Sequence, residues 1–179
     1  MPGHTHPQLR GKLAGGDRKE VGAAASVARE VLDDPGLVRP LVDCLEDGDA
    51  AVVSHAAHAV MQVGRDEPNV FAPHADRLIA ILRRCSQWEI GEQLPKVLAA
   101  VPITDDQTQQ LADILVAQTG NPSNIAAASA LSGLAELATT GRIDAAIARD
   151  AIERALASPR KALAARARRI EQSLGPKGK

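Results

Sequence analysis

Aromatic side chains are almost missing from this sequence. Phe71 and Trp88 are the only aromatic residues among 179, and there is no tyrosine. Strands favour aromatic and β-branched residues, whereas alanine and leucine favour helices. The shortage argues against an all-β fold and against a large aromatic-lined cofactor pocket. It predicts an all-helical chain with a core of Ala, Leu, Val and Ile.

Cysteine is also scarce. Cys44 and Cys85 stand alone in Ala- and Leu-rich segments, and neither is part of a CxxC motif. A chain of 179 residues can build a core without a disulfide. We expect both cysteines to be buried thiols.

Long apolar runs are absent as well. No run approaches the ~20 residues that a membrane-spanning helix needs, so no membrane association is predicted. Residues 1–7 carry no basic start followed by an apolar stretch, so we expect no secretory signal and a cytoplasmic protein.

Charge is balanced overall but unevenly distributed. The net charge is −1, which does not indicate a general affinity for nucleic acid. From Pro159 onward, however, seven basic residues face one acidic residue. This basic end is either a solvated helix face or a contact surface for an acidic or polyphosphate partner. The residues predicted for polyanion binding are Arg160, Lys161, Arg166 and Arg169.

The segment 49–64 has the clearest pattern in the chain. Its apolar residues Val53, Ala56, Ala57, Val60 and Val63 recur at helical spacing. Asp49 predicts the start of the helix and Gly64 its C-terminal cap.

Weaker helical patterns follow one another through most of the chain, separated by Gly, Pro and Asp. Helices are predicted over about 8–14, 17–32, 37–46, 49–64, 70–84 (or 73–84), 86–101, 104–118, 122–139, 143–156 and 158–174. Pro95 falls inside its helix and predicts a kink. Trp88, near the start of that helix, is expected to pack between neighbouring repeats.

The second helix of each pair begins with an aliphatic residue at a regular interval. These residues are Val21, Val53, Ile90, Ile125 (or Asn124) and Leu163, with successive spacings of 32, 37, 35 and 38 residues. A helical hairpin that recurs at roughly this period is typical of an α-solenoid.

The pattern resembles a HEAT repeat of the armadillo-like class, most clearly over 49–64. The resemblance implies an all-α, right-handed α-α superhelix of about five HEAT-like hairpins over residues 9–174, with disordered ends at 1–8 and 175–179. A compact irregular helical bundle is the alternative. The arginine that often follows the first aliphatic residue in this family is absent, so cohesion between repeats is expected to rest on apolar packing.

The resemblance also implies where a partner binds. HEAT-like proteins generally hold a protein, peptide or nucleic acid on the concave face, which the second helices line. The polar residues predicted to face out there are His55, His58, Gln62, Arg65, Glu89, Glu92, Gln93, Lys96, Ser129, Ser132 and Glu136. The alternative is that they form only the solvated side of amphipathic helices.

Catalysis has little support in the sequence. His55 and His58 share a helix face that Glu89 or Glu92 could approach, but no HExxH motif accompanies them. His4 and His6 form an HxH pair on a segment expected to be disordered, which makes a poor metal site. Nucleotide-binding and hydrolase motifs are missing. We predict a protein that is not an enzyme and that needs no cofactor or metal.

The predicted function is therefore a scaffold or adaptor for another protein or peptide. Nucleic-acid or other polyanion binding through the basic C-terminal repeat is the alternative. A DNA glycosylase of HEAT-like architecture would need groove aromatics that this chain lacks. Short HEAT-like proteins also include bilin lyase subunits, but no residue here selects that function.

Overall fold

The computed structural model describes residues 5–15 and 22–174. Ten α-helices and two 3₁₀ segments make up this part of the chain, and no strand occurs in it. The elements are α1 (Thr5–Leu13), α2 (Gly22–Asp33), η1 (Pro35–Leu37), α3 (Val38–Cys44), α4 (Ala50–Asp66), η2 (Pro68–His74), α5 (Ala75–Arg84), α6 (Trp88–Ala100), α7 (Asp105–Gln118), α8 (Asn124–Thr139), α9 (Ala145–Leu156) and α10 (Lys161–Ser173).

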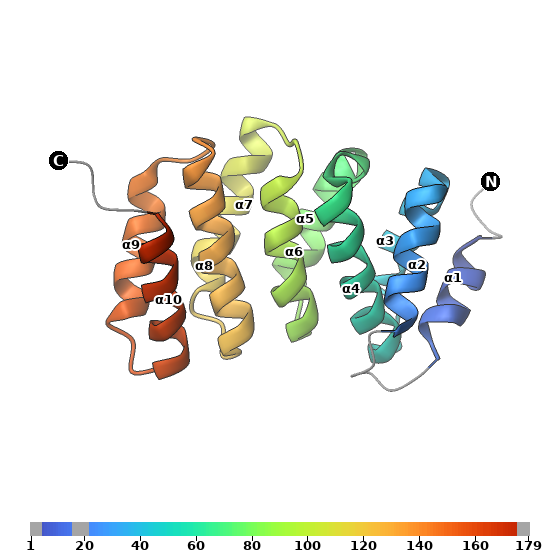
Figure 1. Cartoon of the computed structure of the whole chain (residues 1–179), viewed down its shortest axis with the longest axis horizontal. Helices are drawn as coiled ribbons and strands as arrows, with labels where there is room; N and C mark the ends of the chain where they lie inside the picture. The colour runs from blue at the N-terminus through green and yellow to red at the C-terminus, as the bar shows by residue number, and fades with distance from the viewer. Residues whose placement is uncertain (1–4, 16–21, 175–179) are drawn as a thin grey trace.

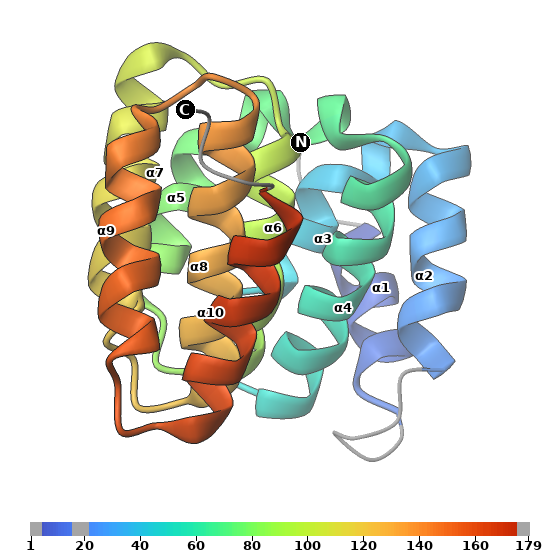
Figure 2. The ribbon, with the colours of Figure 1, turned by 60° about the vertical axis from the view of Figure 1, so that its left-hand side comes forward.

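The helices form five antiparallel pairs stacked side by side (Figure 1). The second members, α2, α4, α6, α8 and α10, form one layer, and each packs on the next. We call this the second-helix layer. The first members, α1, α3, α5, α7 and α9, form the first-helix layer behind it, and the view in Figure 2 shows the same two layers. The predicted helical solenoid of about five hairpins is confirmed.

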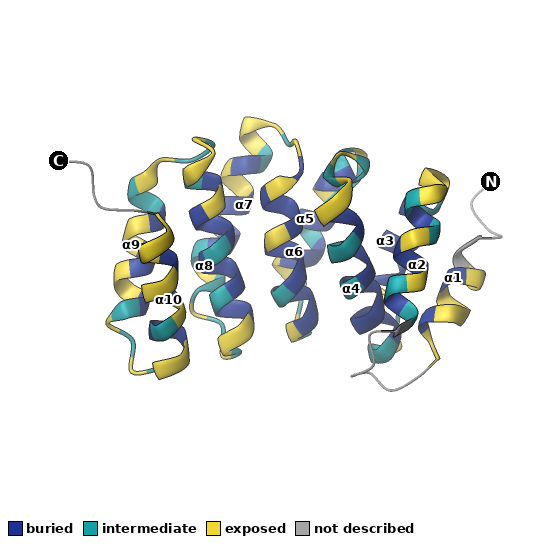
Figure 3. Cartoon of the chain, in the orientation of Figure 1, coloured by how far each residue is buried: buried dark blue, intermediate teal, exposed yellow. Residues whose placement is uncertain are grey.

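The core between the layers is built almost entirely from aliphatic side chains. Phe71 is its one aromatic member, and most of the other large, fully buried side chains are leucines. Figure 3 shows that α4, α6 and α8 are buried along much of their length, whereas α10 is exposed along much of its surface. Each interior pair is covered on both sides by its neighbours, and the last pair on one side only.

Small residues bring the middle second helices unusually close together. A Cβ atom added to Gly91 on α6 would lie 2.9 Å from the Cβ of Ala126 on α8. One added to Gly64 on α4 would lie 2.8 Å from the Val97 side chain on α6. The middle second helices therefore pack against one another more extensively than the first helices do.

Several helix ends differ from the prediction. Gly64 lies inside α4 and does not cap it, because the helix continues to Asp66. The helix predicted from 86 begins at Trp88 with Gln87 as its N-cap, and the helix predicted from 158 begins at Lys161 with Arg160 as its N-cap. The first helix begins at Thr5, before the predicted start. The predicted start of the second helix at Asp17 and the aliphatic Val21 lie outside the described residues, as do 1–4 and 175–179.

Other predicted features agree with the structure. Thr104 caps α7 in a reciprocal capping box, in which its hydroxyl accepts from Gln107 N and the Gln107 side chain accepts from Thr104 N. Pro95 lies inside α6, as predicted. Trp88, in contrast, is 42% exposed at the first residue of α6, so the prediction that it packs between repeats is wrong.

Candidate interaction surface

Four of the residues predicted to face a partner are instead buried. They are His55, Glu89, Gln93 and Ser129, none of them more than 3% exposed. His55 Nδ1 lies 2.7 Å from the carbonyl oxygen of Leu13, and the Ser129 hydroxyl donates to the carbonyl oxygen of Glu92. The expectation that these four face solvent is wrong, because the tight helix spacing places this side of α4, α6 and α8 against the neighbouring helices.

The other predicted residues of the second-helix layer reach the surface. His58, Gln62, Glu92 and Ser132 are half-buried, and Arg65, Lys96 and Glu136 are exposed. Arg65 pairs with Asp66 on its own helix, with Nε 2.9 Å from Oδ1. His58 lies 3.4 Å from the buried Gln93 amide. Of the predicted residues on this face, only Arg65, Lys96 and Glu136 are exposed, and Arg65 already has a partner in Asp66.

The residues predicted for polyanion binding also divide into one that is held within the fold and three that are exposed. Arg160 is half-buried and joins α10 to the loop before α8, since its Nε donates to Asn124 Oδ1 at 2.7 Å and its Nη2 to the Pro122 carbonyl at 3.1 Å. Lys161, Arg166 and Arg169 are exposed. Arg160 therefore has a structural role, while Arg166 and Arg169 remain available on the surface of α10.

Two adjoining hollows bring the exposed members of both predicted sets together. A hollow of about 420 Å³ lies between α8 and α10, and one of about 220 Å³ lies between α6 and α8. Ser132 and Glu136 of α8 line both hollows. We call the two together the C-terminal groove; it is lined by Lys96, Ala99, Ala100, Ser132, Gly133, Ala135, Glu136, Thr139, Arg166, Arg169, Ile170, Ser173 and Leu174.

The hydroxyl groups of the groove are largely used within their own helices. Ser132, Thr139 and Ser173 each donate to a backbone carbonyl three or four residues earlier. The charged side chains are therefore the main polar groups that remain for a ligand, above a floor that includes Ala135 and Ile170. Arg166 has one long contact, with its Nη2 3.5 Å from Ser132 Oγ.

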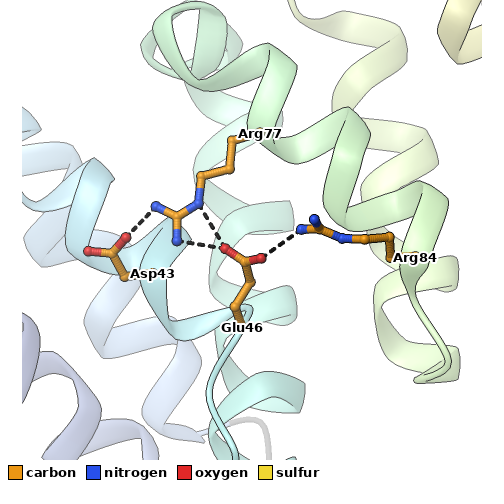
Figure 4. A network of polar contacts seen from close by, with 4 residues as sticks. All are labelled: Asp43, Glu46, Arg77 and Arg84. Atoms are coloured by element: carbon orange, nitrogen blue, oxygen red, sulfur yellow. Dashed lines mark hydrogen bonds and ion pairs between the residues drawn. The ribbon is translucent and has the colours of Figure 1, made fainter.

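Several arginines elsewhere in the structure have carboxylate partners. Arg77 on α5 bonds to Asp43 and Glu46 of the preceding repeat, and Arg84 bonds to Glu46 (Figure 4). Arg10 pairs with Asp47 in the same way. These contacts join successive repeats, so ion pairs accompany the apolar packing that the sequence predicted.

Arg166, Arg169 and Lys96 differ from those arginines. Within residues 5–15 and 22–174, none of the three lies within ion-pair distance of a carboxylate. The C-terminal groove therefore presents three cations and one anion, Glu136, to solvent. Such a surface attracts anionic groups and retains one position that repels them.

Sequence reasoning missed Thr139, Ile170 and Ser173 as groove residues. A usable signal was present, because Thr139 follows Glu136 by three positions and Ser173 follows Arg169 by four, which places each pair on one helix face. The pairing of α8 with α10 across a groove carried no comparable signal in the sequence.

The remaining reactive groups offer no site. Burial raises the pKa of the Cys44 thiol to about 12, and it also raises the pKa of Cys85. In the described part of the chain, no three His, Cys, Asp or Glu side chains gather closely enough to hold a metal ion. The side chains of His4 and His6 lie outside the described residues. No described helix is long and apolar enough to cross a membrane.

Comparisons with known proteins show the fold. Neither a protein-family model nor a curated protein sequence matches the chain. Among solved structures, the crystal structure of an engineered protein is similar to 94% of this chain and 78% of that one, with a TM-score of 0.63 and 19% identity. A designed armadillo repeat protein is also similar over 94% of this chain and 99% of that one, with a TM-score of 0.47 and 16% identity.

Proposed function

We propose that this armadillo-like solenoid is a non-enzymatic scaffold that binds another protein through its second-helix layer. The C-terminal groove is the observation that carries the proposal. It spans three successive second helices and has an apolar floor. Its rim holds Lys96, Arg166 and Arg169, which have no carboxylate partner in the described part of the chain. Repeat proteins present such continuous surfaces because their helices are stacked side by side.

The groove also supports a contact of mixed character. Apolar floor residues gain free energy when water leaves them, at about 25 cal/mol per Å² of apolar area. The charged rim steers encounter and sets specificity. A partner held by both should survive salt concentrations that screen charge alone.

The test is capture of a partner from native lysate by the immobilised full chain, using two charge-swapped variants. Lys96→Glu with Glu136→Lys exchanges the charges of two of the four charged groove residues and leaves the net charge unchanged. The matched control is Asp113→Lys with Arg149→Glu, which swaps two exposed charges on α7 and α9 of the first-helix layer.

We expect the unmodified chain and the control to retain the same protein after a high-salt wash, and the groove variant to lose it. Equal retention by both variants would place the contact elsewhere. Recovery of nucleic acid alone, lost as salt rises, would instead favour polyanion binding through the basic last repeat.

A further inference from the structure

The groove charges alternate in sign from one second helix to the next. Lys96 belongs to α6, Glu136 to α8, and Arg166 and Arg169 to α10. The two hollows meet at α8, where Glu136 borders both of them. A ligand that crosses the groove therefore meets a cation, an anion and a pair of cations in turn.

The helix spacing sets the period of a ligand that matches this order. Packed helices lie about 8–10 Å apart. An extended segment in the polyproline II conformation rises about 3.1 Å per residue and presents every third side chain on the same face. Consecutive second helices are thus about three residues apart along an extended peptide, and α6 and α10 about six.

We propose that the C-terminal groove binds an extended acidic segment of a partner protein, with carboxylates about six residues apart facing Lys96 and the Arg166–Arg169 pair. Glu136, between the two cationic positions, selects a basic residue midway between the two carboxylates. The inference rests on the proposed function and names the class of its partner.

The same residues disfavour a nucleic acid in this groove. Glu136 lies in the middle of the groove and repels a continuous phosphate backbone. Binding of a single strand also uses aromatic side chains for stacking, but the chain's two aromatic residues, Phe71 and Trp88, do not line the groove. Its floor of alanine, glycine and isoleucine suits small side chains of a peptide.

The binding measurement is fluorescence anisotropy with the full chain and a labelled twelve-residue peptide. The peptide carries two glutamates about six residues apart, a lysine midway, and alanine or serine elsewhere. A second peptide of the same composition places the two glutamates side by side. An RNA oligonucleotide of similar length is the third probe.

The key variants are Arg169→Glu and its matched control Arg168→Glu. Both residues are exposed on α10, but only Arg169 lines the groove. We expect Arg169→Glu to lower the affinity for the spaced peptide about tenfold or more, because a charge-assisted contact becomes a repulsion. Arg168→Glu should change that affinity less than about twofold. Thermal unfolding of both variants confirms that each is folded.

A charge exchange tests the middle position. Glu136→Lys should lower the affinity for the peptide with a midway lysine and raise the affinity for a peptide with a midway glutamate. This reversal cannot arise from a general loss of structure. The peptide with adjacent glutamates should bind more weakly than the spaced one.

Three results would overturn the inference: no binding of the spaced peptide, equal weakening by Arg168→Glu and Arg169→Glu, or tighter binding of the RNA than of the peptide. If the spaced peptide fails while the groove charge swap still removes the lysate partner, the proposed function stands and only the acidic class of partner is wrong.

Discussion

At the scale of single residues, the close packing of the second helices depends on glycine, which has no side chain. Gly91 has Ala126 opposite it across the α6–α8 contact, and a methyl group there would overlap a neighbour that has no flexible end to move. Gly11 on α1 has no atom near its missing Cβ. The same substitution should therefore have opposite effects at the two positions.

Gly91→Ala should lower the free energy of unfolding by about 1–2 kcal/mol, because overpacking exceeds the gain in helix propensity. Gly11→Ala should raise it by about 0.5–1 kcal/mol through propensity alone. Urea denaturation measures both. If Gly91→Ala instead raised the free energy of unfolding, α6 and α8 could move apart without loss of stability.

Cys44 makes stability depend on pH in the alkaline range. Burial raises the pKa of its thiol to about 12 in the folded chain, above the ordinary value near 9 in the unfolded chain. The folded state therefore favours the neutral thiol. This contribution is complete below about pH 9 and is lost as the pH rises toward 12.

Stability should accordingly fall more steeply between pH 9 and 12 in the unmodified chain than in Cys44→Ala. Denaturation midpoints measured for both proteins at several pH values give the difference in stability. Other groups titrate alike in both proteins, so their effect cancels in that difference. Parallel curves for the two proteins would show that the folded environment does not hold this thiol neutral.

At the scale of the element, much of the helix pattern could be predicted from sequence and much of the surface could not. The apolar stripe of 49–64 and the Thr104 start signal are local features, and both appear in the structure. Burial of Ser129 depends on how closely α6 approaches α8, which the contact between Gly91 and Ala126 permits. His55 is buried where α1 reaches α4, with its Nδ1 2.7 Å from the Leu13 carbonyl oxygen. Both depend on a second helix, so no single-helix pattern contains them.

The capping box of α7 offers a direct test at this scale. Thr104→Ala removes the hydroxyl that accepts from Gln107 N and should cost about 1 kcal/mol. Thr140→Ala is the control, because that hydroxyl is exposed and bonds to carbonyls already within its own helix. Thermal denaturation should show a larger loss of stability for Thr104→Ala than for Thr140→Ala. Equal losses would mean that the capping box does not stabilise α7.

At the scale of the whole molecule, contacts run mainly between neighbouring pairs of helices. The Arg77 network is one such link, since it joins α5 to the end of α3 in the preceding repeat. Its atoms are partly exposed, so its contribution is modest and salt-dependent.

Arg77→Met should lower the free energy of unfolding by about 1 kcal/mol at low salt and by less at high salt. The Glu46→Gln variant and the double variant complete a cycle that isolates the coupling. No coupling at low salt would leave cohesion to apolar packing alone, as the sequence first indicated.

The stacked architecture also explains why the groove belongs to the C-terminal repeats. Arg10, Arg77 and Arg84 are paired with carboxylates across repeats, whereas Arg166 and Arg169 on α10 have no carboxylate partner among the described residues. The arginines without a carboxylate partner and the closely packed second helices therefore lie on the same surface, which spans α6, α8 and α10.

The most direct measurement is amide chemical-shift mapping of the full chain during titration with the spaced acidic peptide. The account predicts that the largest changes fall within 132–139 on α8 and 166–173 on α10, with smaller ones near Lys96. Changes concentrated on α3, α5 and α7, or none at all, would contradict it.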